Sequence, residues 1–155
     1  MNTIILFWRP SISSFKIDDF QYFIENRDSE YFNWSVWEYD KAHCGDRFFM
    51  VRCGEGKTGI CMSGKFISSP YKDTDWSGQG RDVYYMDMYV DTAIHPDFMP
   101  ILTTERLQAA IPDFDWTGGH SGRLIAASDA AKLEKMWKEF LNENDEIFHY
   151  HAFRD

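Results

Sequence analysis

Residues 45–67 read GDRFFMVRCGEGKTGICMSGKFI and carry the strongest structural pattern of the chain. Two apolar runs within it, residues 47–53 and 60–67, have the composition and length of β-strands. The segment between them, residues 54–59, contains three glycines, which adopt the positive φ angles of a chain reversal at low cost. The pattern therefore predicts a β-hairpin made of these two strands.

Outside the hairpin, four stretches have strand character. Residues 3–8 are an apolar run that stops at Arg9-Pro10, because proline has no main-chain N–H to donate within a sheet. Residues 33–38 are consistent with a strand or a loop, and residues 123–126 predict a short strand. In residues 83–90 the side chains alternate, and one set is expected to face the core. This set consists of Tyr84, Met86, Met88 and Val90.

Two short helices are predicted, one on each side of the hairpin. The first has Asp18 as its N-cap, and its apolar residues recur at intervals of three and four up to Ile24. The second covers residues 104–110 and ends before Pro112, which lacks the N–H that a helix needs.

The clearest helical pattern lies near the end of the chain, from Ser128 as N-cap to about Glu143. Its apolar residues recur at the spacing of one buried face. They are Leu133, Met136, Trp137, Phe140 and Leu141. Glu134 and Lys138 are expected to pair on the exposed face, and residues 149–151 are expected to form a frayed tail.

Length and composition predict one α+β domain that covers residues 1–155. Hydrophobic residues make up 44% and charged residues 26% of the chain, which is ordinary for a globular protein of this size. No run of about 18 apolar residues could span a bilayer, and the N-terminal residues lack the pattern of a secretory signal. We therefore expect a cytoplasmic protein with no membrane contact, whose oligomeric state the sequence leaves open.

The charge of the chain limits the partners that it can have. The net charge is −9 and the pI is near 4.9, so a broad positive surface for non-specific phosphate binding is excluded. Any nucleic-acid binding must be local, in a pocket for one base or along a short basic stripe. Aromatic residues make up 17% of the chain, more than a small core needs, which indicates that some rings line a pocket or a contact surface.

Signatures of metal or covalent chemistry are weak. Cys44, Cys53 and Cys61 are odd in number and form no CxxC pair, so we expect reduced thiols without a metal. The histidines are scattered, and neither a GxSxG nor an HExxH motif occurs. The sequence thus indicates a binding module without a cofactor rather than an enzyme.

The hairpin resembles the core of EVE-like domains, which with the ASCH domains belong to the PUA-like superfamily. The resemblance rests on the Gly-Asp-Arg start and first strand at residues 45–52 and on the Gly-Ile strand within residues 58–66. The opening strand, which ends in Trp8-Arg9-Pro10, and the segments 69–76 and 116–122 also match. The resemblance implies a small β-barrel with helices packed on the outside and a concave pocket. In relatives this pocket holds an extruded modified base of DNA or RNA. EVE proteins carry Arg-Asn after their second tryptophan where this chain has Ser-Val, so the identity of the ligand stays open.

The aromatic and glycine-rich segments of this pattern provide the candidate binding residues. Tryptophan rings suit a flat base, which stacks on aromatic faces and is read along its polar edge. The glycines of residues 118–122 would let a ligand approach the main chain closely. Trp8, at the exit of the opening strand, is expected to hold its ring at the pocket rim. The predicted ligand-binding residues are Trp8, Arg9, Trp34, Trp37, Ser69, Tyr71, His120 and Ser121.

Each of these features also has a plainer interpretation. A tryptophan can be a core ring, and the glycine-rich segment can be a tight turn. The alternative function is a small enzyme, or a small-molecule-binding or protein-binding domain, that uses the same pocket. Basic side chains at the rim would favour a nucleic acid, whereas acidic ones would favour a cationic ligand or a protein partner. The basic candidates are Arg9, Lys16, Lys65, Lys72, Arg81 and Arg123.

Overall fold

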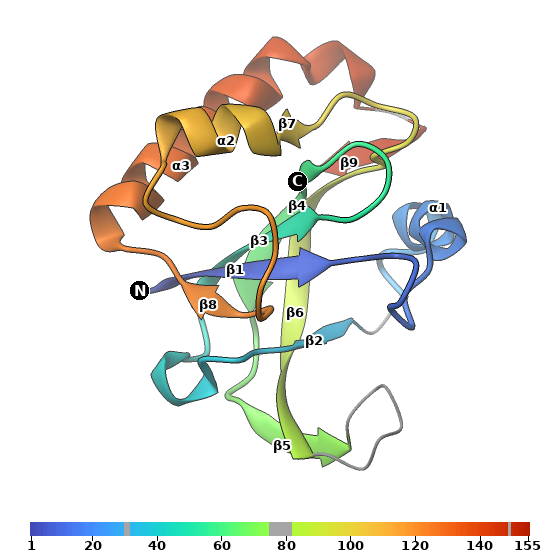
Figure 1. Cartoon of the computed structure of the whole chain (residues 1–155). Coiled ribbons are helices and arrows are strands. Elements are labelled where there is room, and N and C mark those ends of the chain that lie inside the picture. The colour runs from blue at the N-terminus through green and yellow to red at the C-terminus, as the bar shows by residue number, and fades with distance from the viewer. Residues whose placement is uncertain (30–31, 75–81, 149) are drawn as a thin grey trace.

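The fold is built on a strongly curled mixed β-sheet with helices packed outside it (Figure 1). The computed structural model describes residues 1–29, 32–74, 82–148 and 150–155. The helices are α1 (Ile17–Glu25), α2 (Thr104–Ala110) and α3 (Ala127–Glu143), with short 3₁₀ turns at Tyr39–Lys41 and Asp145–Ile147. The strands are β1 (Thr3–Trp8), β2 (Asn33–Ser35), β3 (Arg47–Arg52), β4 (Gly59–Phe66), β5 (Tyr71–Thr74), β6 (Asp82–Ile94), β7 (Leu102–Thr103), β8 (Arg123–Leu124) and β9 (Ala152–Arg154).

The sheet runs in the order β2-β6-β4-β3-β1-β8. β1 and β3 are parallel, and the other neighbours along this path are antiparallel. β5 and β9 add to the long strand β6, and β7 adds to β4. The sheet curls into a half-barrel with α2 and α3 at one end and α1 at its side (Figure 1). This arrangement confirms the α+β fold class and the predicted hairpin of β3 and β4.

Two main-chain hydrogen bonds join the two ends of this sheet. Trp37 N donates to Ser121 O and Glu38 N donates to Gly122 O, each at 2.9 Å. Gly122 has a φ of +95°, and a Cβ there would lie 2.5 Å from Val36 Cα, so only glycine allows the two backbones to come this close. We call this contact between residues 36–38 and 121–122 the seam.

Two helices begin earlier than their sequences suggest. The N-cap of α1 is Lys16 rather than Asp18, and the Asp19 carboxylate accepts a hydrogen bond of 2.8 Å from Lys16 N. The N-cap of α3 is Ala126 rather than Ser128. In α1 the acidic side chain thus satisfies the free N–H of the cap from inside the first turn. The predicted bounds of α2 are confirmed, with Thr103 Oγ1 accepting from Arg106 N.

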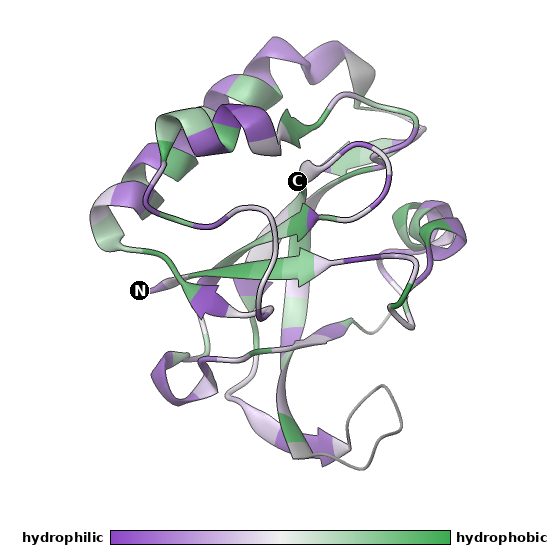
Figure 2. Ribbon diagram, in the orientation of Figure 1, coloured by the Kyte–Doolittle hydropathy of each residue, from purple (hydrophilic) through white to green (hydrophobic). Residues whose placement is uncertain are grey.

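The apolar sides of the sheet and of the helices face one another, while the polar sides of the helices face outward (Figure 2). The predicted buried face of α3 is confirmed, except that Met136 is only partly buried. The alternation in β6 holds for Met86, Met88 and Val90, but Tyr84 is half-buried and Tyr85 of the opposite set is buried.

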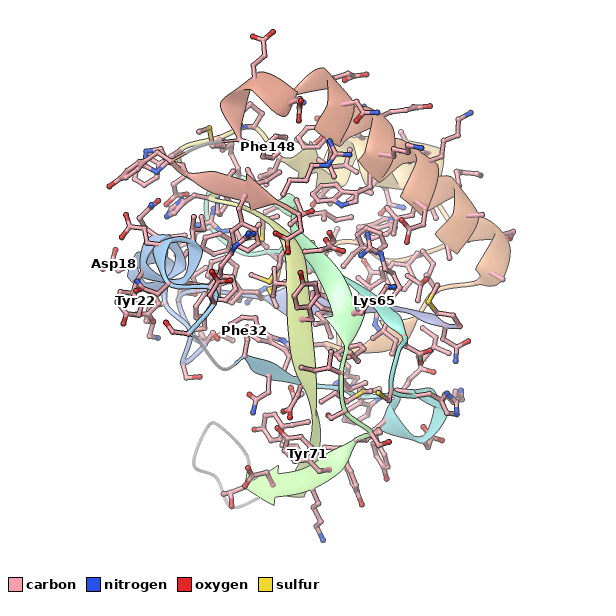
Figure 3. All side chains as sticks on the ribbon, turned by 180° about the vertical axis from the view of Figure 1, so that it is seen from behind. Asp18, Tyr22, Phe32, Lys65, Tyr71 and Phe148 are labelled. Atoms are coloured by element: carbon pink, nitrogen blue, oxygen red, sulfur yellow. The ribbon has the colours of Figure 1, made fainter. Side chains whose placement is uncertain are left out.

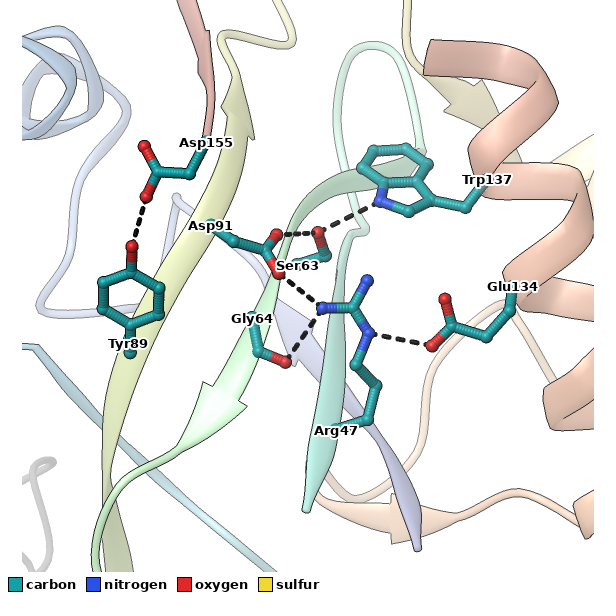
Figure 4. A network of polar contacts seen from close by, with 8 residues as sticks. All are labelled: Arg47, Ser63, Gly64, Tyr89, Asp91, Glu134, Trp137 and Asp155. Carbon is teal, nitrogen blue, oxygen red and sulfur yellow. Dashed lines mark hydrogen bonds and ion pairs between the residues drawn. The ribbon is translucent and has the colours of Figure 1, made fainter. Parts of the chain in front are cut away.

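α3 is attached to the sheet by an ion-pair network around Arg47 on β3 (Figure 4). Arg47 Nη1 lies 2.7 Å from Asp91 Oδ2, and Arg47 Nε lies 2.8 Å from Glu134 Oε1. The predicted pairing of Glu134 with Lys138 is therefore wrong, because the Glu134 side chain turns toward the sheet. The arginine, whose side chain is 12% exposed, bridges a carboxylate of β6 and a carboxylate of α3.

A second polar chain connects the same elements next to this network. Trp137 Nε1 donates to Ser63 Oγ at 3.0 Å, and Ser63 Oγ donates to Asp91 Oδ1 at 2.7 Å (Figure 4). Ser63 is completely buried, so both of these contacts satisfy groups that water cannot reach.

The sequence predicted a frayed tail at residues 149–151, but the end of the chain is held against the sheet. β9 pairs with residues 92–94 of β6, and His95 N donates to His151 O at 2.9 Å. His149 lies outside the described residues. No helix in the described part of the chain is long and apolar enough to cross a membrane.

Candidate functional site

A cleft of about 880 Å³ lies beside the seam. It is lined by four segments and by Cys53, which follows β3. The segments are the end of β1 with the loop after it, the region from β2 to the first 3₁₀ turn, the start of β6, and residues 118–121. Five of the eight predicted ligand-binding residues line it. They are Arg9, Trp34, Trp37, His120 and Ser121.

Two parallel ring pairs form part of the cleft wall. The ring centres of the Trp37 indole and the His120 imidazole are 3.6 Å apart, with an interplanar angle of 3°. Tyr39 and Tyr84 stack in the same way, at 3.7 Å and 10°. Trp37 is 57% exposed, although exposing so large an apolar ring normally costs stability. The cleft thus presents flat π surfaces at its opening.

Ser121 connects the two ends of the sheet through its side chain as well as through its backbone. Its Oγ accepts a hydrogen bond of 2.9 Å from Phe7 N and one of 3.1 Å from Trp34 Nε1. Trp34 also contacts the ring of Phe15 edge to face, at 6.3 Å. The hydrogen bond of its indole N–H and the ring contact with Phe15 together hold Trp34 in one orientation.

Arg123 shapes the glycine-rich loop that carries His120. Its guanidinium donates to three main-chain oxygens of this loop, those of Asp115, Gly118 and His120, at 2.8–3.2 Å. Its Cζ also lies 4.8 Å from the centre of the Phe114 ring. Arg123 is thus committed to the protein's own backbone and does not line the cleft.

Arg9 is the cationic side chain that the cleft contains. It is exposed, lies over Gly54 and has no ion pair or side-chain hydrogen bond with any residue in the described part of the chain. Among the described lining residues there is no Asp or Glu. Of the other basic candidates, Lys16, Lys65 and Lys72 do not line the cleft. Arg81 and the nearby Trp76 lie outside the described residues.

The predicted position of Trp8 at the rim is wrong. Trp8 is completely buried, and its Nε1 donates to Phe15 O at 2.7 Å. Its ring stacks on Phe20 of α1, with ring centres 5.3 Å apart. The loop after β1 folds back over the strand end and covers the indole, so Phe15 rather than Trp8 reaches the cleft.

Ser69 and Tyr71 also lie outside the cleft lining. Tyr71 is on β5, at the end of the sheet opposite α3 (Figure 3). Its hydroxyl donates to Asp87 Oδ1 at 2.6 Å and accepts from Asn33 Nδ2 at 2.9 Å. Asn33 lines the cleft, so Tyr71 helps to position a lining residue through this hydrogen bond without lining the cleft itself.

Sequence reasoning missed several rings of the site, namely Phe15, Phe32, Tyr39 and Tyr84. The only available signal was the surplus of aromatic residues, which does not say which rings meet. Their pairing depends on the antiparallel contact of β2 with β6 and on the adjacent bond from Val36 N to Tyr84 O.

The described residues contain no group of three or more His, Cys, Asp or Glu side chains placed to hold a metal ion. Cys53 and Cys61 are buried and Cys44 is exposed, and none forms a disulfide. Burial raises the pKa of the Cys61 thiol to about 12, with a smaller opposing effect of the Arg52 charge. The cleft as described offers stacking surfaces, hydroxyl and amide groups, and one cation.

No protein-family model matches the chain, and no curated protein matches it. Solved structures do resemble it. Rpa0253 from Rhodopseudomonas palustris has a TM-score of 0.57 at 17% identity, over 97% of this chain and 98% of that one. Human THYN1, solved in complex with DNA containing 5-methylcytosine, has a TM-score of 0.56 at 10% identity, over 89% and 98%. The YTH domain of Mmi1, solved with RNA, has a TM-score of 0.55 at 6% identity, over 94% and 86%.

These matches cover nearly the whole of each chain, and THYN1 and the YTH domain are both PUA-like folds. At sequence identities of 6–17%, these similarities establish the fold of the chain but not its function. The chain therefore has a PUA-like fold, as the resemblance in its sequence predicted.

Proposed function

We propose that the cleft binds one base of a DNA or RNA strand, and that its preferred ligand is a modified base extruded from the strand. The observation that carries this proposal is the make-up of the cleft. Its described lining is rich in aromatic rings, with one free cation and no carboxylate, although the chain as a whole has a net charge of −9. The absence of acidic groups there favours an anionic strand over a cationic ligand.

The size and chemistry of the cleft suit a base with part of its backbone. Its volume of about 880 Å³ falls at the upper end of ligand sites, which span roughly 300–1,000 Å³. Bases stack on exposed rings such as Trp37, and a positive side chain such as Arg9 can contact the adjoining phosphate. An extruded base exposes both its faces and its polar edge, which a base within a duplex does not.

Two of the similar structures support the same ligand class. THYN1 was solved with DNA that contains 5-methylcytosine, and the Mmi1 YTH domain with RNA. These ligands belong to those proteins. They make nucleic acid the first class to test for a related cleft in the same fold.

The test is a titration of labelled oligonucleotides, followed by fluorescence anisotropy. Matched single strands and duplexes would carry one cytosine, 5-methylcytosine, adenine or N6-methyladenine at the central position. We expect the wild-type protein to bind one modified strand more tightly than its unmodified counterpart. Trp37→Ala should weaken this binding about tenfold or more, because stacking on one ring contributes roughly 1–3 kcal/mol.

Tyr22→Ala is the matched control. Tyr22, on α1 (Figure 3), is 58% exposed, about as much as Trp37, but it does not line the cleft. Its loss should leave binding unchanged. The proposal fails if the wild-type protein binds no oligonucleotide, or if it binds plain duplex as tightly as any modified strand. Tight binding of a free small molecule or of a peptide in place of the oligonucleotides would favour the alternative functions.

A further inference from the structure

The Ser121 side chain is held in an unusual hydrogen-bonding state at the cleft wall. Its Oγ accepts from Phe7 N at 2.9 Å and from Trp34 Nε1 at 3.1 Å. A serine hydroxyl has two lone pairs and one proton. Both of its acceptor positions are therefore occupied by donors of the protein itself.

The hydroxyl proton of Ser121 remains available. None of the described residues accepts a hydrogen bond from it, and Ser121 is one of the residues that line the cleft. The two accepted bonds also fix the oxygen between β1 and β2, so the O–H can point only in the remaining tetrahedral direction. The cleft wall thus carries a donor that cannot turn into an acceptor.

We infer that Ser121 is a specificity-determining residue of the cleft, whose hydroxyl donates to a lone-pair acceptor on the edge of the bound ring. This inference rests on the proposed function and narrows it. The ligand must present an unprotonated ring nitrogen or a carbonyl oxygen at this point. An amino group or a ring N–H would meet a second donor and be rejected, because neither partner could then be satisfied.

The position of Ser121 relative to the stacked rings supports this role. Ser121 follows His120 directly in the chain, and Ser121 O accepts from Trp37 N at 2.9 Å. The donor and the Trp37–His120 pair are therefore held by one rigid contact of the seam. A fixed donor beside a fixed stacking surface reads the edge of a ring with little ordering cost on binding.

The experiment combines ligand analogues with variants of the protein. The probes are the oligonucleotide that the wild type binds best and versions in which one acceptor of the target base is removed or weakened. For cytosine these are 3-deazacytosine and 2-thiocytosine, and for adenine they are 1-deaza-, 3-deaza- and 7-deazaadenine. We expect one analogue to bind the wild type about tenfold more weakly than its parent, the loss typical of one well-placed hydrogen bond.

The decisive measurement is the same comparison in Ser121→Ala. This variant should bind parent and analogue equally, because the donor that distinguishes them is gone, whatever its overall affinity. Ser121→Thr, which keeps the hydroxyl, should restore the discrimination. Ser35→Ala is the matched control and should keep the discrimination between parent and analogue. Ser35 also lines the cleft, but its side chain has no hydrogen bond to another described residue.

The outcomes separate this inference from the proposed function. Binding of the parent strand with no sensitivity to any analogue would overturn the role of Ser121 alone. An analogue effect that persists undiminished in Ser121→Ala would do the same. Failure of the wild type to bind any strand would overturn the proposed function, and this inference with it.

Discussion

The indole N–H of Trp8 donates to the main-chain oxygen of Phe15 at 2.7 Å, and this bond ties the core of the sheet to the wall of the cleft. Trp8 is completely buried, whereas Phe15 lines the cleft. The loop between them returns to the strand end, where the Phe15 ring also packs on Trp8 with ring centres 5.2 Å apart. A residue that never contacts a ligand thus helps to place one that can.

Trp8→Ala should therefore lower the free energy of unfolding by about 3–5 kcal/mol, the range for truncating a buried aromatic ring. Trp8→Phe should cost less, because it keeps most of the apolar volume but loses the hydrogen bond. Trp37→Ala should change stability by no more than about 0.5 kcal/mol, since the ring is largely exposed. Urea unfolding curves of the three variants test this. Equal losses for Trp8→Ala and Trp37→Ala would contradict the assignment of Trp8 to the core.

Arg47 on β3 should stabilise the protein mainly through its ion pair with Asp91 on β6, and less through its contact with Glu134 on α3. Arg47→Ala leaves Asp91 without its ion-pair partner, and removal of one member of a largely buried pair costs about 3 kcal/mol or more. Glu134→Gln should cost less than about 1 kcal/mol, because the Glu134 side chain is 44% exposed. Thermal or urea unfolding gives both values. A Glu134→Gln loss as large as that of Arg47→Ala would mean that the α3 contact, not the Asp91 contact, dominates.

His95 should make the stability of the protein depend on pH. Burial lowers the pKa of His95 below its ordinary value of 6.5, and the charges of His151 and Arg52 act in the same direction, while Asp97 and Asp18 oppose them. The unfolded chain therefore binds a proton more readily than the folded one. The free energy of unfolding should therefore be highest above about pH 6.5 and should decrease as the pH drops below that value.

Thermal unfolding at pH 7.5 and pH 5.5 measures this effect in the wild type and in His95→Asn. Asparagine can still accept the hydrogen bond that His95 Nδ1 receives from Asp97 N, but it does not titrate. The part of the pH dependence that disappears in the variant belongs to His95. An unchanged pH profile in His95→Asn would show that other groups cause the loss.

The three cysteines should differ sharply in reactivity. Cys44 is exposed, whereas Cys53 and Cys61 are buried, and the thiolate needed for reaction is strongly disfavoured at Cys61 by its pKa of about 12. A thiol reagent such as DTNB at pH 8 should modify one thiol of the native protein and three after denaturation. Cys44→Ser should remove the native reaction. Rapid modification of two or more thiols in the native protein would contradict the burial of Cys53 and Cys61.

Binding of an oligonucleotide should depend only weakly on salt. Arg9 is the single free cation of the described cleft lining, and one phosphate contact lowers affinity by only about threefold between 50 and 200 mM salt. Arg9→Gln should flatten this dependence further and weaken binding. A loss of several hundredfold over the same range would show that many phosphates are contacted outside the cleft.

Sequence patterns alone predict the hairpin of β3 and β4, the helices α2 and α3, and the α+β class. These features follow from local periodicity and from glycine and proline positions, which act over a few residues and are visible in the chain order. Trp34, Trp37, His120 and Ser121 could be selected as site residues for the same reason, because rings and glycines stand out in composition.

Which of these residues come into contact depends on the tertiary structure. Trp34 and Ser121 are 87 positions apart and come together because two main-chain bonds of the seam join the ends of the sheet. Trp8 does not line the predicted site, because the loop after β1 folds back over its ring. The C-terminal residues form β9, because they pair with an edge of β6. Such contacts depend on how distant segments satisfy one another's hydrogen bonds and buried surface, and no local pattern in the chain encodes that outcome.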